Sequence, residues 1–298
     1  MASKVEQKDN PALRGIKDIL AGSAGGVAQC LSGHPLDTIK VRLQTQSKTN
    51  PKYSGMMDCV KVTIKEEGLI GLYKGIQSPL FGLTFFNAVQ FLSYGQAKSL
   101  VQTGNQELSI PQYILAGALV GFTVSFVESP IDLMKSQLQV QYSGSAAKYN
   151  GLYDCAKKIF QEGGIRGVYQ GLQATMIRDI PATAAYFGAY ELARKGMKGP
   201  NEDLDKMAAW KILIAGGIGG MAYWASTFPL DVVKSTIQTD ATKISERKYK
   251  GWMDCFKSIH QQLGWKGFFR GFAPCMVRSF PANATCFLAY EYAKKVMG

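Results

Sequence analysis

Three charged residues lie in otherwise apolar stretches of the sequence. Arg178 and Asp179 are the only charges in residues 171–190, and Arg278 is the only charge in residues 271–290. A charged side chain within a membrane span costs roughly 3 kcal/mol or more and is therefore a candidate functional group. An arginine fork binds a carboxylate through two parallel hydrogen bonds, and an aspartate binds a cation. We therefore expect a solute that carries both charges, with its carboxylate on Arg278 and its cation on Asp179.

A second set of charges occurs in the block Pro-x-Asp-x-x-Lys, which recurs three times with a glutamine four residues after the lysine. The members are Asp37, Lys40 and Gln44; Asp132, Lys135 and Gln139; and Asp231, Lys234 and Gln238. Spacings of three and four residues place all three side chains on one helical face. The proline before them loosens the helix.

Two arrangements of these blocks are open. Local ion pairs at helix ends would contribute ~1 kcal/mol or less each. A ring in which the aspartate of one unit pairs with the lysine of another, braced by the glutamines, would form a removable plug. We favour the ring, because unpaired charge within a membrane is costly.

The whole chain consists of three copies of one unit of about 100 residues. The block Tyr-x-Gly-x-x-Asp-Cys-x-Lys begins at Tyr53, Tyr149 and Tyr249, in register with the blocks above. Its cysteines, Cys59, Cys155 and Cys255, occupy equivalent positions. A packing role is therefore expected for them rather than a set of disulfides.

The elements that position these residues are expected to be membrane-spanning helices. Charge-free windows cover residues 19–36, 75–97, 108–127 and 212–230. About 20 helical residues cross the hydrocarbon layer, and the two stretches with midspan charges bring the expected number of spans to six. Buried helices of a large soluble protein are the alternative. Each unit also carries Gly-x-x-x-Gly, which favours close helix packing in lipid; the pairs are Gly22 and Gly26, Gly117 and Gly121, and Gly216 and Gly220.

The predicted fold is thus an all-α membrane protein with six transmembrane helices and three short surface helices in three tandem pseudo-threefold repeats. A polar segment at residues 1–15 precedes repeats at 16–105, 106–205 and 206–298, which share one bundle. Length alone suggests two domains, and the repeats replace that expectation. The 46% hydrophobic content excludes a disordered chain or a collagen.

Other function classes are disfavoured by what the sequence lacks. His34 and His260 have no metal-ligand spacing around them, and no nucleophile elbow or phosphate-binding loop occurs. We therefore expect neither an enzyme nor a metal site. The net charge of +12 also suits a helical-repeat protein that binds nucleic acid. Such a protein needs a polar exterior, whereas the charge-free windows would expose apolar surface to water.

These blocks resemble the mitochondrial carrier family over the whole chain. The resemblance implies six tilted transmembrane helices around a central cavity, three short matrix helices and alternating access in the mitochondrial inner membrane. It also implies a monomer without a cofactor, bound to the lipid cardiolipin, that transports a small zwitterionic or cationic metabolite. The ring of aspartates and lysines corresponds to the family's matrix gate.

The family's cytoplasmic gate has the pattern aromatic-acid-x-x-base on the even spans. Its charged residues in this sequence are Lys98, Glu191, Arg194, Glu291 and Lys294. Gly95 stands where the first repeat would carry its acid. At most two of three ion pairs can therefore form, which predicts a weak cytoplasmic gate.

The family's lipid sites correspond to the glycines that open the even spans. Free amides and the positive end of the helix dipole favour phosphate there. The matching residues are Gly75, Gly171 and Gly271, with added charge from Lys74 and Arg270. Gln170 carries no charge, which puts the second of these lipid sites in doubt.

In this family the substrate contacts fall where the repeats differ: Gly82, Arg178 and Arg278, with Leu83 and Asp179 beside them. The blocks around Arg178 and Arg278 look most like the carnitine/acylcarnitine branch. In that interpretation Gly82 and Leu83 leave an apolar wall for an acyl chain. Aromatic residues such as Tyr186 and Trp224 would suit a quaternary ammonium.

A basic amino-acid carrier is the alternative substrate class. Residues 82–88, Gly-Leu-Thr-Phe-Phe-Asn-Ala, look closer to that branch. Glu128 precedes Asp132 by four residues and shares its helical face. A second acid in the cavity would suit arginine, lysine or ornithine, unless Glu128 pairs with a basic residue of the gate.

Overall fold

The computed structural model describes residues 11–47, 50–102, 108–141, 148–199 and 207–297, and for a few helical residues it describes the backbone alone. Within these ranges the chain forms six long helices and no strand. The long helices are α1 (Pro11–Thr45), α3 (Gln77–Val101), α4 (Ile110–Val140), α6 (Leu172–Met197), α7 (Ala209–Gln238) and α9 (Phe272–Met297). Each repeat contributes two of them, so the all-helical, three-repeat fold is confirmed.

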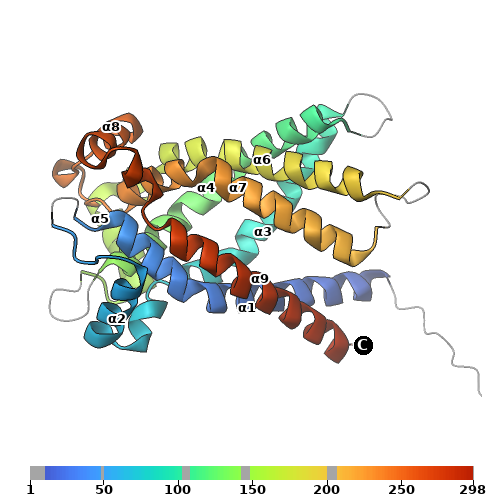
Figure 1. Cartoon of the computed structure of the whole chain (residues 1–298), viewed down its shortest axis with the longest axis horizontal. Helices are drawn as coiled ribbons and strands as arrows, with labels where there is room; N and C mark the ends of the chain where they lie inside the picture. Colours follow the sequence, from blue (N-terminus) through green and yellow to red (C-terminus); the bar gives the residue numbers. More distant parts are fainter. Residues whose placement is uncertain (1–10, 48–49, 103–107, 142–147, 200–206, 298) are drawn as a thin grey trace, which may run out of the picture.

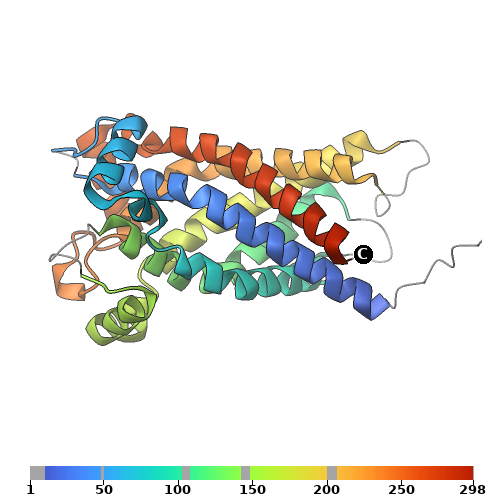
Figure 2. The same cartoon turned by 90° about the horizontal axis from the view of Figure 1, so that it is seen from below.

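A short helix follows the first long helix of each repeat. These are α2 (Met56–Glu67), α5 (Leu152–Val168) and α8 (Trp252–Leu263), accompanied by the 3-10 turns η1 (Leu69–Tyr73), η3 (Ile244–Glu246) and η4 (Trp265–Phe269). In two perpendicular views, the long helices run along the long axis of the molecule and the short helices gather at one end (Figures 1 and 2). The C-terminal helix α9 ends at the opposite end.

The short helices are held by the equivalent cysteines. Cys59 is fully buried and packs with Ile39 and Leu43 of α1. Cys155 and Cys255 pack in the same way under α4 and α7. All of the cysteines are free thiols in the structure, which agrees with a packing role.

Neighbouring long helices pair across the repeat boundaries: α1 lies along α9, α3 along α4, and α6 along α7. Within the second repeat, α4 also lies along α6. There Gly121 and Gly117 let the backbone of α4 approach Asp179 and Thr183 of α6, with no room for a methyl group. This is the close packing that the glycine pattern predicts.

In the other repeats the Gly-x-x-x-Gly prediction is wrong for the glycines that the structure characterises. Around Gly22, Gly216 and Gly220, space for a methyl group is open. On α7 it is Gly219 that approaches a neighbour, at the ring of Tyr186 on α6. The face of α7 that contacts α6 therefore carries Gly219, not Gly216 and Gly220. One residue turns a helix by about 100°, so Gly219 and Gly220 point in different directions.

By length and composition, one helix of the described chain, α4, is apolar enough to cross a membrane on its own. The described parts of the other long helices are less apolar over a comparable length. Their buried faces carry polar residues, among them Asp37 and Lys40 on α1, and Arg178 and Asp179 on α6.

Candidate functional site

The aspartates and lysines of the repeated block form a closed ring between α1, α4 and α7. Lys135 Nζ lies 2.7 Å from Asp37 Oδ2, Lys234 Nζ lies 2.6 Å from Asp132 Oδ2, and Lys40 Nζ lies 2.6 Å from Asp231 Oδ2. Every pair joins two different repeats, so the local-pair alternative does not describe this structure. The ring residues occupy the C-terminal turns of these helices, near the end that carries α2, α5 and α8 (Figure 1).

The glutamines cross the same boundaries, but only one binds a ring carboxylate. Gln44 Nε2 donates to Asp231 Oδ2 at 3.2 Å. Gln139 donates instead to the hydroxyl of Thr38, and Gln238 to the carbonyl of Ser129. The predicted glutamine brace therefore acts on one ion pair, while the other two glutamines join adjacent helices directly.

A cavity of about 310 Å³ lies against this ring. Its lining comes from all six long helices. The candidate residues that line it, besides those of the ring, are Gly82, Glu128, Arg178, Trp224 and Arg278. Asp179 and Tyr186 do not line it, and the side chain of Leu83 lies outside the described residues.

Arg278 reaches the ring from α9. Its Nε lies 2.9 Å from Asp37 Oδ1, while the other oxygen of Asp37 pairs with Lys135. The side chain of Arg278 keeps 26% of its surface exposed, the largest exposure among the charged residues that join the ring from the cavity wall. Arg278 can thus offer guanidinium nitrogens to a carboxylate in the cavity while one nitrogen remains beside Asp37.

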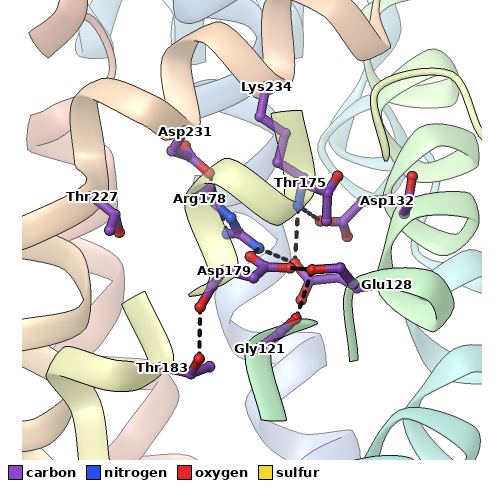
Figure 3. A network of polar contacts seen from close by, with 12 residues as sticks. Gly121, Glu128, Asp132, Thr175, Arg178, Asp179, Thr183, Thr227, Asp231 and Lys234 are labelled. Atoms are coloured by element: carbon purple, nitrogen blue, oxygen red, sulfur yellow. Dashed lines mark hydrogen bonds and ion pairs between the residues drawn. The ribbon is translucent and has the colours of Figure 1, made fainter. Parts of the chain in front are cut away.

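Arg178 and Glu128 form a second connection to the ring (Figure 3). Arg178 Nη2 pairs closely with Glu128 Oε1, and Arg178 Nη1 lies 3.5 Å from Asp231 Oδ1. Glu128 Oε1 also accepts a hydrogen bond from Lys234 Nζ at 2.9 Å. Glu128 therefore pairs with a basic residue of the gate, Lys234, as the sequence allows. It also lines the cavity.

Asp179 does not face the cavity, which contradicts its assignment as the solute's cation ligand. Its side chain is 1% exposed, and Oδ2 accepts a hydrogen bond from Ser125 of α4 at 3.2 Å. Arg178 Nη2 folds back to within 2.5 Å of Asp179 Oδ1. Adjacent helical residues point about 100° apart, but the long arginine side chain spans that angle.

The aromatic and small residues divide between the cavity and the helix contacts. Tyr186 packs on Gly219 of α7 and stacks on Tyr190, so it belongs to the α6–α7 contact. Trp224 lines the cavity. Gly82 lies directly against the side chain of Ile131, which fills the space that a larger residue would occupy.

Sequence reasoning missed Tyr223, which lines the cavity beside Trp224. Its ring lies 5.6 Å from the guanidinium carbon of Arg178. The signal that could have identified it is the difference between repeats: the equivalent positions are Gln29 and Val124.

The comparison with known families decides the class of protein. The family model described as "Mitochondrial carrier protein" matches residues 12–105, 106–201 and 205–298. The chain belongs to the mitochondrial carrier family. It is therefore a transporter of the mitochondrial inner membrane, as the resemblance predicts, and a nucleic-acid-binding protein is no longer a competing interpretation.

Similar carriers fall into more than one substrate class. Mitochondrial substrate carrier family protein S of Dictyostelium discoideum is 44% identical over 96% of this chain and 99% of its own. The human mitochondrial carnitine/acylcarnitine carrier protein is 41% identical, covering 95% of this chain and 94% of its own. The mitochondrial basic amino acids transporter of Bos taurus is also 41% identical, covering 91% and 88%. Similarity thus leaves the choice between substrate classes to the cavity.

At the other end of the carrier, the described gate residues make contacts within their own helices and one contact between repeats. Glu191 Oε1 accepts a hydrogen bond from Arg194 on its own helix at 2.9 Å. Lys98 lies over the rings of Tyr94 and Tyr113, 5.3 and 5.9 Å from their centroids. The side chains of Glu291 and Lys294 lie outside the described residues.

The three predicted lipid-site glycines share a left-handed backbone conformation before α3, α6 and α9, with φ of 79° at Gly75, 85° at Gly171 and 81° at Gly271. Lys74 already contacts Glu67 at 2.5 Å and the carbonyl of Gln141 at 3.0 Å. The backbone N–H of Arg270 donates to the carbonyl of Gly267 at 3.4 Å, while among the described residues its guanidinium has no hydrogen-bond or ion-pair partner. Cardiolipin at these positions stays a prediction.

Within the described residues, no group of three or more histidine, cysteine or acidic side chains could hold a metal ion. Arg42 is the centre of a network of hydrogen bonds between the first and second repeats. Arg42 donates to both carboxylate oxygens of Glu67, at 2.8 and 3.0 Å, and to the carbonyl of Gln139 at 3.0 Å. This network joins α1, α2 and α4 beside the ring.

Proposed function

We propose that this carrier exchanges carnitine and acylcarnitines across the inner membrane by alternating access. The observation that carries the proposal is that one cavity presents an arginine and a glutamate, Arg278 and Glu128, next to a closed ring of ion pairs. Carnitine carries a carboxylate and a quaternary ammonium. A cavity with separated charges of both signs is suited to that pair.

The charge balance of the site supports a zwitterion. The three aspartates and three lysines of the ring cancel. What remains is Arg178 and Arg278 against Glu128 in the cavity wall and Asp179, which lies behind the wall and neutralises Arg178 by direct contact. The site is therefore neutral in sum, and a zwitterion such as carnitine leaves it neutral, whereas arginine, lysine or ornithine adds one positive charge.

We assign the carboxylate of the solute to Arg278 and the cation to Glu128 instead of Asp179. Glu128 lines the cavity and keeps 15% of its side chain exposed, whereas Asp179 is sealed between α4 and α6. A cation that approaches Glu128 competes with Arg178 and Lys234, both of which contact the same oxygen.

An acyl chain has an apolar wall available on the side of α3. Pro79, Gly82 and Phe86 of α3 line the cavity together with Val41 and Ile131. Because Gly82 has no side chain, Ile131 can lie against the helix backbone there. Rotation of Ile131 would open a groove along α3 for aliphatic carbons.

The basic amino-acid class is the second candidate, and Glu128 is the observation that favours it. A carboxylate among basic partners is a ligand for a guanidinium or an ammonium. The bovine relative named as a basic amino acids transporter is as similar in sequence as the carnitine relatives. We rank this class second because the charges of the site sum to zero, whereas a basic amino acid would add a positive charge.

We also propose that the six long helices span the membrane, with α2, α5 and α8 at the matrix surface. Large apolar side chains are exposed on the outer faces of the long helices. They include Phe85, Leu92, Phe122, Phe126, Met221 and Leu288. In water such surfaces would drive aggregation, while in lipid they are solvated.

Exchange in reconstituted liposomes tests this proposal. Vesicles preloaded with carnitine should take up labelled carnitine, and external acylcarnitine should compete more strongly than arginine, lysine or ornithine. Uptake of basic amino acids without exchange of carnitine would reverse the order of the two candidates.

A further inference from the structure

Tyr223 and Trp224 form an aromatic corner in the cavity wall. Their ring centroids lie 5.3 Å apart with the planes at 70°, and both side chains line the cavity. The equivalent residues are Gln29 and Cys30 in the first repeat and Val124 and Ser125 in the second. The corner therefore breaks the pseudo-threefold symmetry, as an asymmetric solute requires of its site.

Both rings of the corner already hold cations of the protein. Lys40 Nζ lies 4.4 Å from the centroid of Trp224, and the guanidinium carbon of Arg178 lies 5.6 Å from that of Tyr223. Both distances are within the ~6 Å range of a cation–π contact. In the described part of the chain, neither Lys135 nor Lys234 lies over an aromatic ring. Only one of the three ring lysines is therefore also bound by an aromatic face.

Opening the ring must empty this face. Lys40 is on α1, while the groups that it contacts, Asp231, Trp224 and Phe228, are all on α7. Separation of α1 from α7 removes the ammonium from the carboxylate and from the indole in one step. The vacated Trp224 face then lies in the cavity wall beside the charge of Asp231.

We propose that the aromatic corner is an exchangeable cation site, filled by Lys40 when the ring is closed and by the quaternary ammonium of the solute as the ring opens. Trp224 and Tyr223 are then specificity-determining residues. The inference deepens the proposed function and rests on it in one respect, that the cavity takes up a cationic solute.

The chemistry of the corner favours a quaternary ammonium over an ordinary ammonium or guanidinium. A tetraalkylammonium has no N–H donor, so Glu128 and Asp231 attract it by charge alone, without hydrogen bonds, and an aromatic face adds a contact that suits it. Lysine and arginine side chains gain more from carboxylates. The corner therefore distinguishes two solute classes that Glu128 alone would accept.

Tetramethylammonium chloride is a probe that isolates this site. Its binding is measured as thermal stabilisation of the purified carrier, with sodium chloride at equal ionic strength as the salt control. Lys40→Met vacates the corner and should lower the half-saturating concentration about two- to thirty-fold, the range that a cation–π contact supports. Lys135→Met breaks a ring pair without an aromatic partner and should leave that concentration within about twofold of wild type.

The tryptophan variants complete the test. Trp224→Leu should cancel the gain of Lys40→Met when the two are combined, and Trp224→Phe should retain part of it. Trp210→Leu, on the same helix but 58% exposed on the outside, is the matched control and should have no effect. Equal shifts in Lys40→Met and Lys135→Met, or a gain that survives Trp224→Leu, would overturn the proposal.

This test does not depend on which metabolite is transported, because the probe is not a transported metabolite. If the liposomes exchange arginine but not carnitine while Lys40→Met still tightens tetramethylammonium binding, the proposed function fails and the exchangeable corner stands. If carnitine is exchanged and the Lys40 effect is absent, the function stands and the corner fails.

Discussion

Lys40 of the first repeat pairs with Asp231 of the third at 2.6 Å, and this pair closes the ring between the two ends of the repeat series. The three ring pairs are not equivalent. Asp231 is also contacted by Gln44 and Arg178 and has 6% of its side chain exposed. Asp132 is contacted by Lys234 and is 29% exposed.

The first prediction follows from this inequality. Asp231→Asn leaves Lys40 and Arg178 near a neutral group in a buried setting, and breaking a buried pair costs about 3–5 kcal/mol. Asp132→Asn should cost less, because that carboxylate is more exposed and Lys234 keeps its contact with Glu128. Thermal unfolding of the two purified variants checks this order. An equal or larger loss of stability in Asp132→Asn would contradict this order.

The second prediction separates solute binding from packing at the two acids of the cavity region. Glu128→Gln should raise KM for the transported solute about tenfold or more, because it removes a carboxylate from the cavity wall. Asp179→Asn should lower the unfolding temperature while KM changes little, because its side chain faces Ser125 between α4 and α6. Initial exchange rates at several solute concentrations, measured beside thermal unfolding, test both. A KM effect confined to Asp179→Asn would restore that residue as the cation ligand.

The third prediction concerns the contact of α4 with α6. Gly121→Ala places a methyl group against the backbone of Asp179 and the hydroxyl of Thr183. Overpacking of this kind typically costs about 1–3 kcal/mol. Gly216→Ala is the matched control, because open space surrounds Gly216. The prediction fails if both variants unfold at the same temperature.

The fourth prediction is a pH dependence at Glu67, at the end of α2. Burial raises the pKa of the Glu67 carboxyl, but hydrogen bonds from Arg42 and Lys74 outweigh it, so the pKa lies below its ordinary value. A carboxyl with a depressed folded-state pKa stabilises the fold above its unfolded pKa and loses that contribution as the pH falls. Stability should therefore decline as the pH falls below about 4.5.

Glu67→Gln should remove part of that decline and lower stability at neutral pH. Glu66→Gln is the control, since Glu66 forms an exposed pair with Lys52 and exposed pairs contribute little. Thermal unfolding at pH 7, 5 and 4 supplies the comparison. If the stability of wild type and of Glu67→Gln fell in parallel with pH, the Glu67 carboxyl would not be the source of the decline.

The repeats and the ring could be predicted because the same residue types recur three times at fixed spacing. Asp37 and Lys40 needed only helical periodicity to be placed on one face, and the threefold recurrence pointed to pairing between repeats. The midspan charges could not be oriented in this way. Arg178 and Asp179 are adjacent, and the rotation of α6 that points one to the cavity and the other to Ser125 is set by packing against Gly121 and Gly117 of α4.

Packing also determines which of the small and aromatic residues form helix contacts and which line the cavity. The Gly-x-x-x-Gly spacing occurs on α1, α4 and α7, but it marks a contact only where a partner backbone lies opposite, as at Gly121. Tyr186 and Trp224 look equally suited to bind a cation in sequence. The structure puts Tyr186 between helices and Trp224 in the cavity, next to Tyr223.

The most direct test of the account is the exchange of labelled carnitine by wild-type carrier and by Arg278→Ala in liposomes preloaded with carnitine, measured beside the exchange of labelled arginine. The account predicts that wild-type carrier exchanges carnitine faster than arginine and that Arg278→Ala abolishes carnitine exchange. Arginine exchange without carnitine exchange, or full carnitine exchange by Arg278→Ala, would contradict it.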